Sequence, residues 1–282
     1  MNNNNIYKQD YGKVSVVIPT YNRSSELANT LQCVLNQTYS DLEVLICDDG
    51  STDNTKDVVN EIIIRDSRVK YIDCGHNGRP AIPRNFGIQN ATGEWLAFLD
   101  DDDAWIINKL ESQLTALNRT HFKACCTNAY KVFEDKLNSG EAYFKVGKDR
   151  KYTYKDFNLV NRVICSSMLI HRSLIDECYG FPEDNSLRAI EDYALWNRIS
   201  IYTKIYYIST PLVLYTMSNP TSVRKTNQIS FKEVKSRVDN NFINWIANKP
   251  VQIKNRYRRE LCFAGLIKPL LKLKWKLNRV FK

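Results

Sequence analysis

The chain has 282 residues, of which 43% are hydrophobic, 25% charged and 11% aromatic, a mixture typical of a globular protein and not of a disordered one. The net charge is +9, but residues 251–282 hold ten Lys and Arg against one Glu, so the first 250 residues are neutral. A neutral main part argues against a nucleic-acid-binding domain and assigns the basic character to the C-terminal segment.

Neither a recognisable secretory signal nor a regular cysteine spacing is expected from the residue pattern. The N-terminal "MNNNNIYKQD" has no positive region followed by an apolar one, and no run of 18 apolar residues occurs anywhere. The eight cysteines form no CxxC pair. We therefore expect reduced thiols in a cytoplasmic protein without a secretory signal or a transmembrane helix.

The first hundred residues alternate apolar runs with amphipathic segments. The predicted elements are strands at 14–19, 42–47, 69–73 and 94–99, and helices at 24–37, 55–65 and 81–91. Ser24 or Ser25 is expected to cap the first helix, and Pro83 to lie in the first turn of the third. Repeated strand–helix–strand units with nearly continuous apolar strands predict an α/β fold, with a mainly parallel sheet and helices on both faces.

The second half is less regular. Its predicted elements are a strand at 122–133, a polar loop at 134–160, a strand at 164–172, a helix at 191–200, a strand–turn–strand at 205–215, and helices at 230–248 and 252–281.

Carboxylates follow two of the predicted strands, at the edge of the sheet where α/β proteins bind ligands. Asp48 and Asp49 follow the second strand, and four consecutive aspartates, Asp100 to Asp103, follow the fourth. Adjacent carboxylates repel one another unless a cation or solvent offsets the repulsion. A hard divalent cation such as Mg²⁺ or Mn²⁺ would do so, and a solvated acidic loop is the equally good alternative.

Two further groups of charged residues are candidates for the same site. Arg79 and Arg84 lie between the acidic segments, and the planar guanidinium suits a diphosphate, although a surface Arg is the more common case. Glu191 and Asp192 open the helix predicted at 191–200. A carboxylate there can act as a general base towards a hydroxyl, or can complement the helix dipole.

Four segments together resemble a known family. The segments are "VSVVIPTYNR", "DLEVLICDDGSTDNT", "GEWLAFLDDDDAW" and "AIEDYALWNR", and in this order they resemble the family 2 inverting glycosyltransferases, which have the nucleotide-sugar-binding GT-A fold. The resemblance covers about residues 13–216. It implies a flexible N-terminus (1–12), a nucleotide-binding half (13–103), an acceptor half (104–216) and a C-terminal helical extension (217–282).

The resemblance also implies roles for individual residues. Pro19 and Tyr21 would bind the nucleobase, Asp49 would recognise uracil, and Arg84 would contact the diphosphate. Asp100 or Asp101 would contact the ribose or a metal-bound water, and Asp102 would bind the metal. Asp192 would be the general base, and Glu191, Ser166 and Ser167 would contact the acceptor. Two positions depart from the usual pattern, namely Asp101, where the family has a small residue, and Pro83, where it has alanine. Because an inverting mechanism needs no nucleophile, Cys165, Ser166 and Ser167 need not be catalytic. They are expected either to line the acceptor pocket or to pack in the core.

The reaction implied is a metal-dependent, single displacement in which an α-linked UDP-sugar gives a β-glycoside. The chain has no Q-x-x-R-W motif after "EDY", which processive members carry, so transfer of one sugar is expected. Non-processive relatives of this type often add Glc or Gal to a GlcNAc or GalNAc diphosphate lipid in O-antigen or capsule synthesis. A nucleotidyltransferase is an alternative, disfavoured because "PTYNRSSE" lacks glycine, and a non-catalytic sugar-nucleotide-binding or membrane-docking protein is another.

The C-terminal segment has the pattern of a basic amphipathic helix. Its apolar residues recur at helical spacing, at Leu266, Leu270, Leu273, Leu277 and Phe281. Its basic residues would lie on another face of the helix, at Lys268, Lys272, Lys276 and Arg279. Such a helix is typical of binding to an anionic membrane surface, and the alternative is packing on its own domain. The favoured expectation is a cytoplasmic enzyme held peripherally on the inner face of the membrane, where it meets a lipid-diphosphate-linked sugar acceptor.

Overall fold

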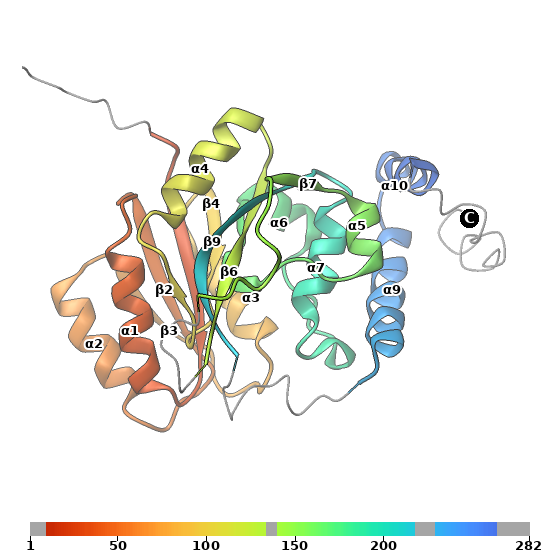
Figure 1. The fold of residues 1–282 in the computed structure, drawn as a ribbon. Coiled ribbons are helices and arrows are strands. Elements are labelled where there is room, and N and C mark those ends of the chain that lie inside the picture. The colour runs from red at the N-terminus through yellow and green to blue at the C-terminus, as the bar shows by residue number, and fades with distance from the viewer. Residues whose placement is uncertain (1–9, 134–139, 218–228, 264–282) are drawn as a thin grey trace, which may run out of the picture.

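The computed structural model describes residues 10–133, 140–217 and 229–263. The basic amphipathic segment 266–282 therefore lies outside the described residues. In the described part, a nine-stranded sheet forms the centre of the molecule. Helices cover both of its faces (Figure 1), so the predicted α/β architecture is confirmed.

The N-terminal half follows the predicted order. Its elements are β1 (Val14–Thr20), α1 (Ser24–Leu35), β2 (Leu42–Asp48), α2 (Thr55–Arg65), β3 (Val69–Asp73), α3 (Ala81–Asn90) and β4 (Trp95–Phe98), and β1 pairs in parallel with β2 and β4. The predicted serine cap of α1 is wrong. Arg23 occupies the N-cap position, and Ser24 is already helical, with its N–H donated to Asp53 Oδ2 at 3.2 Å.

Alternating side chains of the strands build two hydrophobic cores. Val16 and Ile18 of β1 lie in the core beneath α1, α2 and the later helix α4 (Lys109–Thr120), whereas Val17 lies in the core shared with α3. At Gly87 of α3 a Cβ atom would come within 2.4 Å of Val17 Cγ1, so this helix approaches the sheet more closely than a side chain would allow. Burial on both faces explains why these strands are continuously apolar.

The strands of the C-terminal half add antiparallel pairings, so the sheet is mixed, although the longest pairings in the sheet are parallel. Its strands are β5 (Ala104–Trp105), β6 (Ala124–Val132), β7 (Arg150–Tyr152), β8 (Leu169–His171) and β9 (Ile205–Thr216). β6 and β9 are parallel, and β8 joins β4 to β6 in antiparallel fashion. The strand order in the sheet is β3-β2-β1-β4-β8-β6-β9-β5, with β7 paired to β9. The expected strand–turn–strand at 205–215 is a single strand. The pairing register shifts where Asn128 faces Pro211, because proline lacks the N–H that a regular ladder needs.

Several helices of this half were not predicted. They are α4 (Lys109–Thr120), α5 (Tyr154–Leu159), α6 (Arg172–Cys178) and short 3₁₀ turns at Cys165–Ser167 and Asn185–Leu187. The polar segment 134–160, expected to be a loop, contains β7 and α5 in its described part. The strand expected at 164–172 begins as one of the 3₁₀ turns, and only Leu169–His171 pairs in the sheet.

The C-terminal helices pack on the rest of the molecule. α7 (Glu191–Ile199) contacts α9 (Phe231–Ala247), and α10 (Val251–Phe263) lies against α5 and α9. Phe242 and Trp245 belong to the same hydrophobic core as the sheet residues. These helices confirm the predicted helical extension as far as residue 263. No helix within the described ranges is long and apolar enough to cross a membrane.

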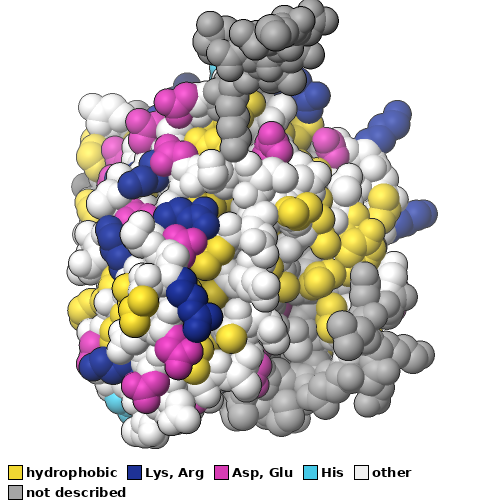
Figure 2. Space-filling view, turned by 90° about the vertical axis from the view of Figure 1, so that its left-hand side faces the viewer, with side chains coloured by type: hydrophobic (Ala, Val, Ile, Leu, Met, Phe, Trp, Pro, Cys, Tyr) yellow, Lys and Arg dark blue, Asp and Glu magenta, His cyan; other side chains and the backbone are white. Residues whose placement is uncertain are grey.

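The surface and the cysteines agree with the composition. On the face that carries α1 and α2, basic and acidic side chains are interspersed (Figure 2). The seven cysteines whose side chains the structure describes are free thiols.

Candidate active site

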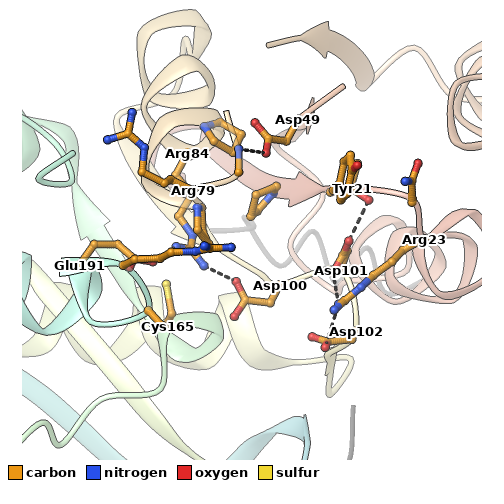
Figure 3. Close-up of a pocket in the computed structure, with 18 of the residues that line it drawn as sticks. Tyr21, Arg23, Asp49, Arg79, Arg84, Asp100, Asp101, Asp102, Cys165 and Glu191 are labelled. Carbon is orange, nitrogen blue, oxygen red and sulfur yellow. Dashed lines mark hydrogen bonds and ion pairs between the residues drawn. The ribbon is translucent and has the colours of Figure 1, made fainter. Parts of the chain in front are cut away.

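The carboxyl ends of β1, β2 and β4 open into a cleft of about 650 Å³. It brings together most of the predicted site residues, namely Pro19, Tyr21, Asp49, Arg84, Asp100, Asp101, Asp102, Glu191 and Asp192 (Figure 3). These residues come from five separate segments of the chain. The structure does not bring Ser166 and Ser167 to this cleft, because both are fully buried beneath it.

At one end of the cleft Tyr21 lies next to a glycine-containing loop. Its ring centroid is 4.8 Å from that of His76, at an interplanar angle of 32°. The two oxygens of the Asp49 carboxylate accept the backbone N–H groups of Asn77 at 2.9 Å and Gly78 at 2.8 Å. Asp49 therefore fixes the loop that follows β3, and each of its oxygens retains a lone pair for a further donor.

Arg23 neutralises two of the four consecutive aspartates. Its Nη1 lies 2.7 Å from Asp101 Oδ1 and 2.9 Å from Asp102 Oδ2 (Figure 3). Asp101 also accepts a hydrogen bond from Thr20 Oγ1 at 2.8 Å. Burial raises the pKa of Asp101 to about 7, and the nearby Arg23 opposes that rise. The Asp102 side chain keeps 19% of its surface exposed, so it can still meet a ligand in the cleft.

Asp103 points away from the cleft and has a structural role. It is 2% exposed, and it accepts hydrogen bonds from Ser166 Oγ at 2.5 Å and from the Thr216 N–H at 2.9 Å. Ser166 Oγ in turn accepts the Asp100 N–H at 3.1 Å. Ser166 thus joins two aspartates of the run, while Ser167 donates to the Ile164 carbonyl at 2.7 Å. Both serines are therefore buried and hydrogen-bonded within the protein, and their predicted acceptor contacts stay a prediction.

Arg84 connects the acidic run to the start of α7. Its Nη2 lies 2.6 Å from Asp100 Oδ1, and its Nη1 lies 2.7 Å from Glu191 Oε1. The guanidinium is 5.4 Å from the ring of Phe181, and Arg84 Nε is buried with no hydrogen-bond partner among the described residues. Because Arg84 also lines the cleft, its positive charge lies close to any anion that binds there. Arg79, the other candidate, lines the cleft and donates to the Glu183 carbonyl at 2.6 Å.

Asp192 lies in the first turn of α7 and is 6% exposed. One of its carboxylate oxygens accepts from Asn161 Nδ2 at 3.3 Å, and the other from the Tyr193 N–H at 2.7 Å. A carboxylate held in this way can accept a proton from a hydroxyl that enters the cleft. Cys165 also lines the cleft, but burial raises the pKa of its thiol well above the usual range and so opposes a nucleophilic role.

The donor set of the acidic run suits a hard divalent cation. Within residues 10–133, 140–217 and 229–263, no three His, Cys, Asp or Glu side chains are grouped so as to hold a metal ion. Asp102 and Asp100 present carboxylate oxygens to the cleft. One or two carboxylates together with substrate phosphates are the usual ligands of Mg²⁺, so these residues fit a cation that binds with its substrate.

The sequence matches Glycosyl transferase family 2 over residues 15–179, and the chain belongs to this family. A β-1,3-glucosyltransferase of Escherichia coli, WfgD, is named for transfer from UDP-Glc to α-D-GlcNAc-diphosphoundecaprenol. It is 31% identical over 226 residues, which cover 80% of this chain and 84% of WfgD. A Campylobacter jejuni GalNAc(5)-diNAcBac-PP-undecaprenol β-1,3-glucosyltransferase is 29% identical, over 75% of this chain and 67% of its own length.

Solved structures share the fold. Residues 1–349 of TarS from S. aureus, in complex with UDP-GlcNAc, superpose with a TM-score of 0.68 at 20% identity, over 86% of this chain and 69% of that one. The mannosyltransferase PcManGT of Pyrobaculum calidifontis, in complex with GDP-Man and Mn²⁺, gives a TM-score of 0.55 at 17% identity, over 96% of this chain and 85% of that one. The predicted GT-A fold is confirmed, and the chain is a glycosyltransferase.

Sequence reasoning missed the parts of the site that depend on distant partners. Arg23 directly follows the "PTYN" motif, but its aspartate partners are 78 and 79 residues away along the chain. His76 and Asn161 lie in segments without a recognisable motif. The charge of Arg23, adjacent to a recognised motif, is the one signal that could have identified it.

Proposed function

We propose that this protein transfers a single hexose, with glucose favoured, from a UDP-sugar to a hydroxyl of a sugar-diphosphate-polyprenol. The product would be a β-glycoside in the synthesis of a surface polysaccharide. The observation that carries the proposal is the placement of Asp49, Arg84, Asp102 and Asp192 around one cleft. The names of the E. coli and C. jejuni relatives support a glucosyl donor and a lipid-linked acceptor.

The nucleotide end of the donor would occupy the cleft beside β1 and β2. Tyr21, which is 43% exposed, offers an aromatic face on which uracil can stack. Asp49 offers a lone pair to a ring N–H while it holds the loop at Asn77 and Gly78. Because His76 lies against Tyr21, the base would displace the imidazole or stack beside it.

The transfer would be one displacement. The acceptor hydroxyl attacks the anomeric carbon from the side opposite UDP, Asp192 takes the hydroxyl proton, and the bond to the β-phosphate oxygen breaks. Arg84 offsets the charge that develops on the departing diphosphate, and Glu191 holds the Arg84 guanidinium in place at 2.7 Å. Attack from the opposite side inverts an α-linked donor to a β-linked product.

Asp102, with Asp100 beside it, is the residue that would hold Mg²⁺ or Mn²⁺. When bound, the cation would neutralise negative charge on the donor diphosphate. Arg23 already contacts Asp102, so the cation and the guanidinium would compete for this carboxylate.

The experiment that tests the proposal is a donor panel. The purified protein is mixed with UDP-Glc, UDP-Gal, UDP-GlcNAc, UDP-GalNAc or a GDP-sugar, together with Mn²⁺ and a short-lipid GlcNAc or GalNAc diphosphate. The products are then analysed by mass spectrometry. We expect a metal-dependent gain of one hexose from one UDP-sugar. Failure of all five donors, with UDP binding intact, would contradict the acceptor, and absence of UDP binding would contradict the nucleotide site.

A further inference from the structure

A second cavity, of about 480 Å³, adjoins the cleft on the far side of Asp192. The two cavities share Arg188, Ala189 and Asp192 as lining residues. Its volume lies within the range of about 300–1,000 Å³ that is typical of ligand pockets. The candidate base therefore stands on a wall common to the donor cleft and to a separate space.

The lining of the second cavity is largely apolar. Its aliphatic and aromatic residues come from four parts of the chain and include Phe144, Ile164, Ala189, Ile190 and Phe231. Among the described lining residues Arg188 is the one cation, Asp192 the one anion, and Asn161 the one neutral amide. Phe231 at the start of α9 is 58% exposed, so the apolar surface continues to the outside of the molecule.

The backbone at the shared wall is held in an uncommon conformation. Ala189 has φ +67°, in the left-handed region that residues other than glycine rarely adopt. It lies between the exposed Arg188 and the helix that carries Asp192. Such local strain persists where the surrounding structure fixes it, commonly at binding sites.

We propose that this second cavity binds the lipid side of the acceptor. The acceptor hydroxyl meets Asp192, the diphosphate on the same sugar meets Arg188, and the first isoprenoid units lie against the apolar wall that ends at Phe231. The proposal rests on the proposed function. An inverting displacement requires the acceptor to approach from the side opposite UDP, and a single cation beside an apolar wall is complementary to an amphiphile that joins a phosphate to a hydrocarbon.

The first test varies the lipid of the acceptor. Methyl, prenyl and farnesyl esters of α-GlcNAc diphosphate are compared with the hexose donor at saturation, and kcat/KM is measured. We expect the farnesyl ester to exceed the methyl ester by at least about tenfold, because several apolar carbons leave water. Phe231→Ser should reduce that ratio, whereas Ile64→Ser, at an 85% exposed position on α2, should leave it unchanged. Equal kcat/KM for all esters, or an unchanged ratio in Phe231→Ser, would overturn the inference.

The second test separates the phosphate from the lipid. In Arg188→Gln we expect KM for the farnesyl diphosphate acceptor to rise about tenfold, as for a lost charge-assisted hydrogen bond. KM for octyl α-GlcNAc, which has no phosphate, and KM for the donor should be unchanged, and Arg188→Lys should restore part of the affinity. A rise in donor KM instead would assign Arg188 to UDP and overturn the inference. Transfer by the wild-type protein to the farnesyl diphosphate acceptor upholds the proposed function whatever Arg188→Gln shows, whereas transfer to neither acceptor overturns both proposals.

Discussion

The four aspartates that follow β4 are identical in the sequence but have different partners in the structure. Asp100 is paired with Arg84, Asp101 and Asp102 share Arg23, and the buried Asp103 accepts from Ser166. Two arginines and a hydroxyl thus offset the like-charge repulsion that the run would otherwise cost. Only the members that face the cleft remain available for a ligand.

Asp192→Asn tests the general base. The amide keeps the shape of the side chain but accepts no proton, so we expect transfer to fall by about 10²–10⁴-fold or more, with UDP-sugar binding retained. Turnover is followed by UDP release, and binding by calorimetry. Asp176→Asn, an exposed change on α6, serves as the matched control. Near-normal turnover of Asp192→Asn would remove this residue from the mechanism.

Arg23→Gln tests the competition at Asp102. Because the guanidinium lies 2.9 Å from Asp102 Oδ2, its loss should free that carboxylate for a cation. We expect tighter Mn²⁺ binding in the presence of UDP, measured as a fall in the free Mn²⁺ signal in electron paramagnetic resonance. Arg65→Gln, an exposed change on α2, should bind Mn²⁺ as the wild type does. Weaker or unchanged binding in Arg23→Gln would show that the guanidinium does not oppose the metal.

At the scale of elements, α4 is held to the sheet through a buried lysine. Lys109 is fully buried, lies 3.9 Å from the ring centroid of Trp105, and donates to Gln113 Oε1 at 2.7 Å. Gln113 Nε2 donates in turn to the Cys125 and Ser167 carbonyls at 3.0 and 2.9 Å. Burial lowers the pKa of Lys109 to about 7 from the ordinary 10.5.

Lys109→Met tests this pKa through stability. Between the folded pKa of about 7 and the ordinary value of 10.5, the unfolded chain binds a proton that the folded protein lacks. The contribution of Lys109 to stability therefore increases as the pH rises through that interval, and it is constant below pH 7. Thermal unfolding from pH 6 to 10 should show a smaller increase of Tm in Lys109→Met than in the wild type. An identical pH dependence in the two proteins would contradict a depressed pKa.

The sequence predicted the elements whose pattern is local. β1 to β4 and the helices between them follow from apolar runs and turn residues, and their observed bounds differ from the predicted ones by at most two residues. α4 was missed because Lys109 and Gln113 look like surface residues, whereas tertiary partners bury both. β9 was divided at Pro211 because the sequence does not show the register shift opposite Asn128 that accommodates a proline.

The same limit applies to the candidate site, where the sequence predicted the residues of local motifs but not their distant partners. Its motif residues lie around one cleft, since parallel strands place their carboxyl ends at one edge of the sheet. The pairing of Arg23 with Asp101 and Asp102, the contact of Asn161 with Asp192, and the burial of Ser166 depend on long-range packing. No local pattern encodes these contacts.

At the scale of the whole molecule, the charge distribution bears on where the protein works. Residues 251–282 carry the entire net charge of +9, and we propose that segment 266–282 binds an anionic membrane surface. Each basic residue near such a surface contributes about 1 kcal/mol. Deletion of 266–282 should abolish cosedimentation with anionic vesicles, and the full chain should bind neutral vesicles weakly. Undiminished cosedimentation of the shortened chain would favour packing of the segment on its own domain.

The measurement that tests the central claim most directly is the anomeric configuration of the product. The wild-type protein converts an α-linked UDP-hexose and farnesyl α-GlcNAc diphosphate, and the new linkage is read from the proton coupling at its anomeric centre by nuclear magnetic resonance. A single displacement with Asp192 as base predicts a β-linkage throughout. An α-linked product would contradict the account, because retention requires a different mechanism from the one that this cleft supports.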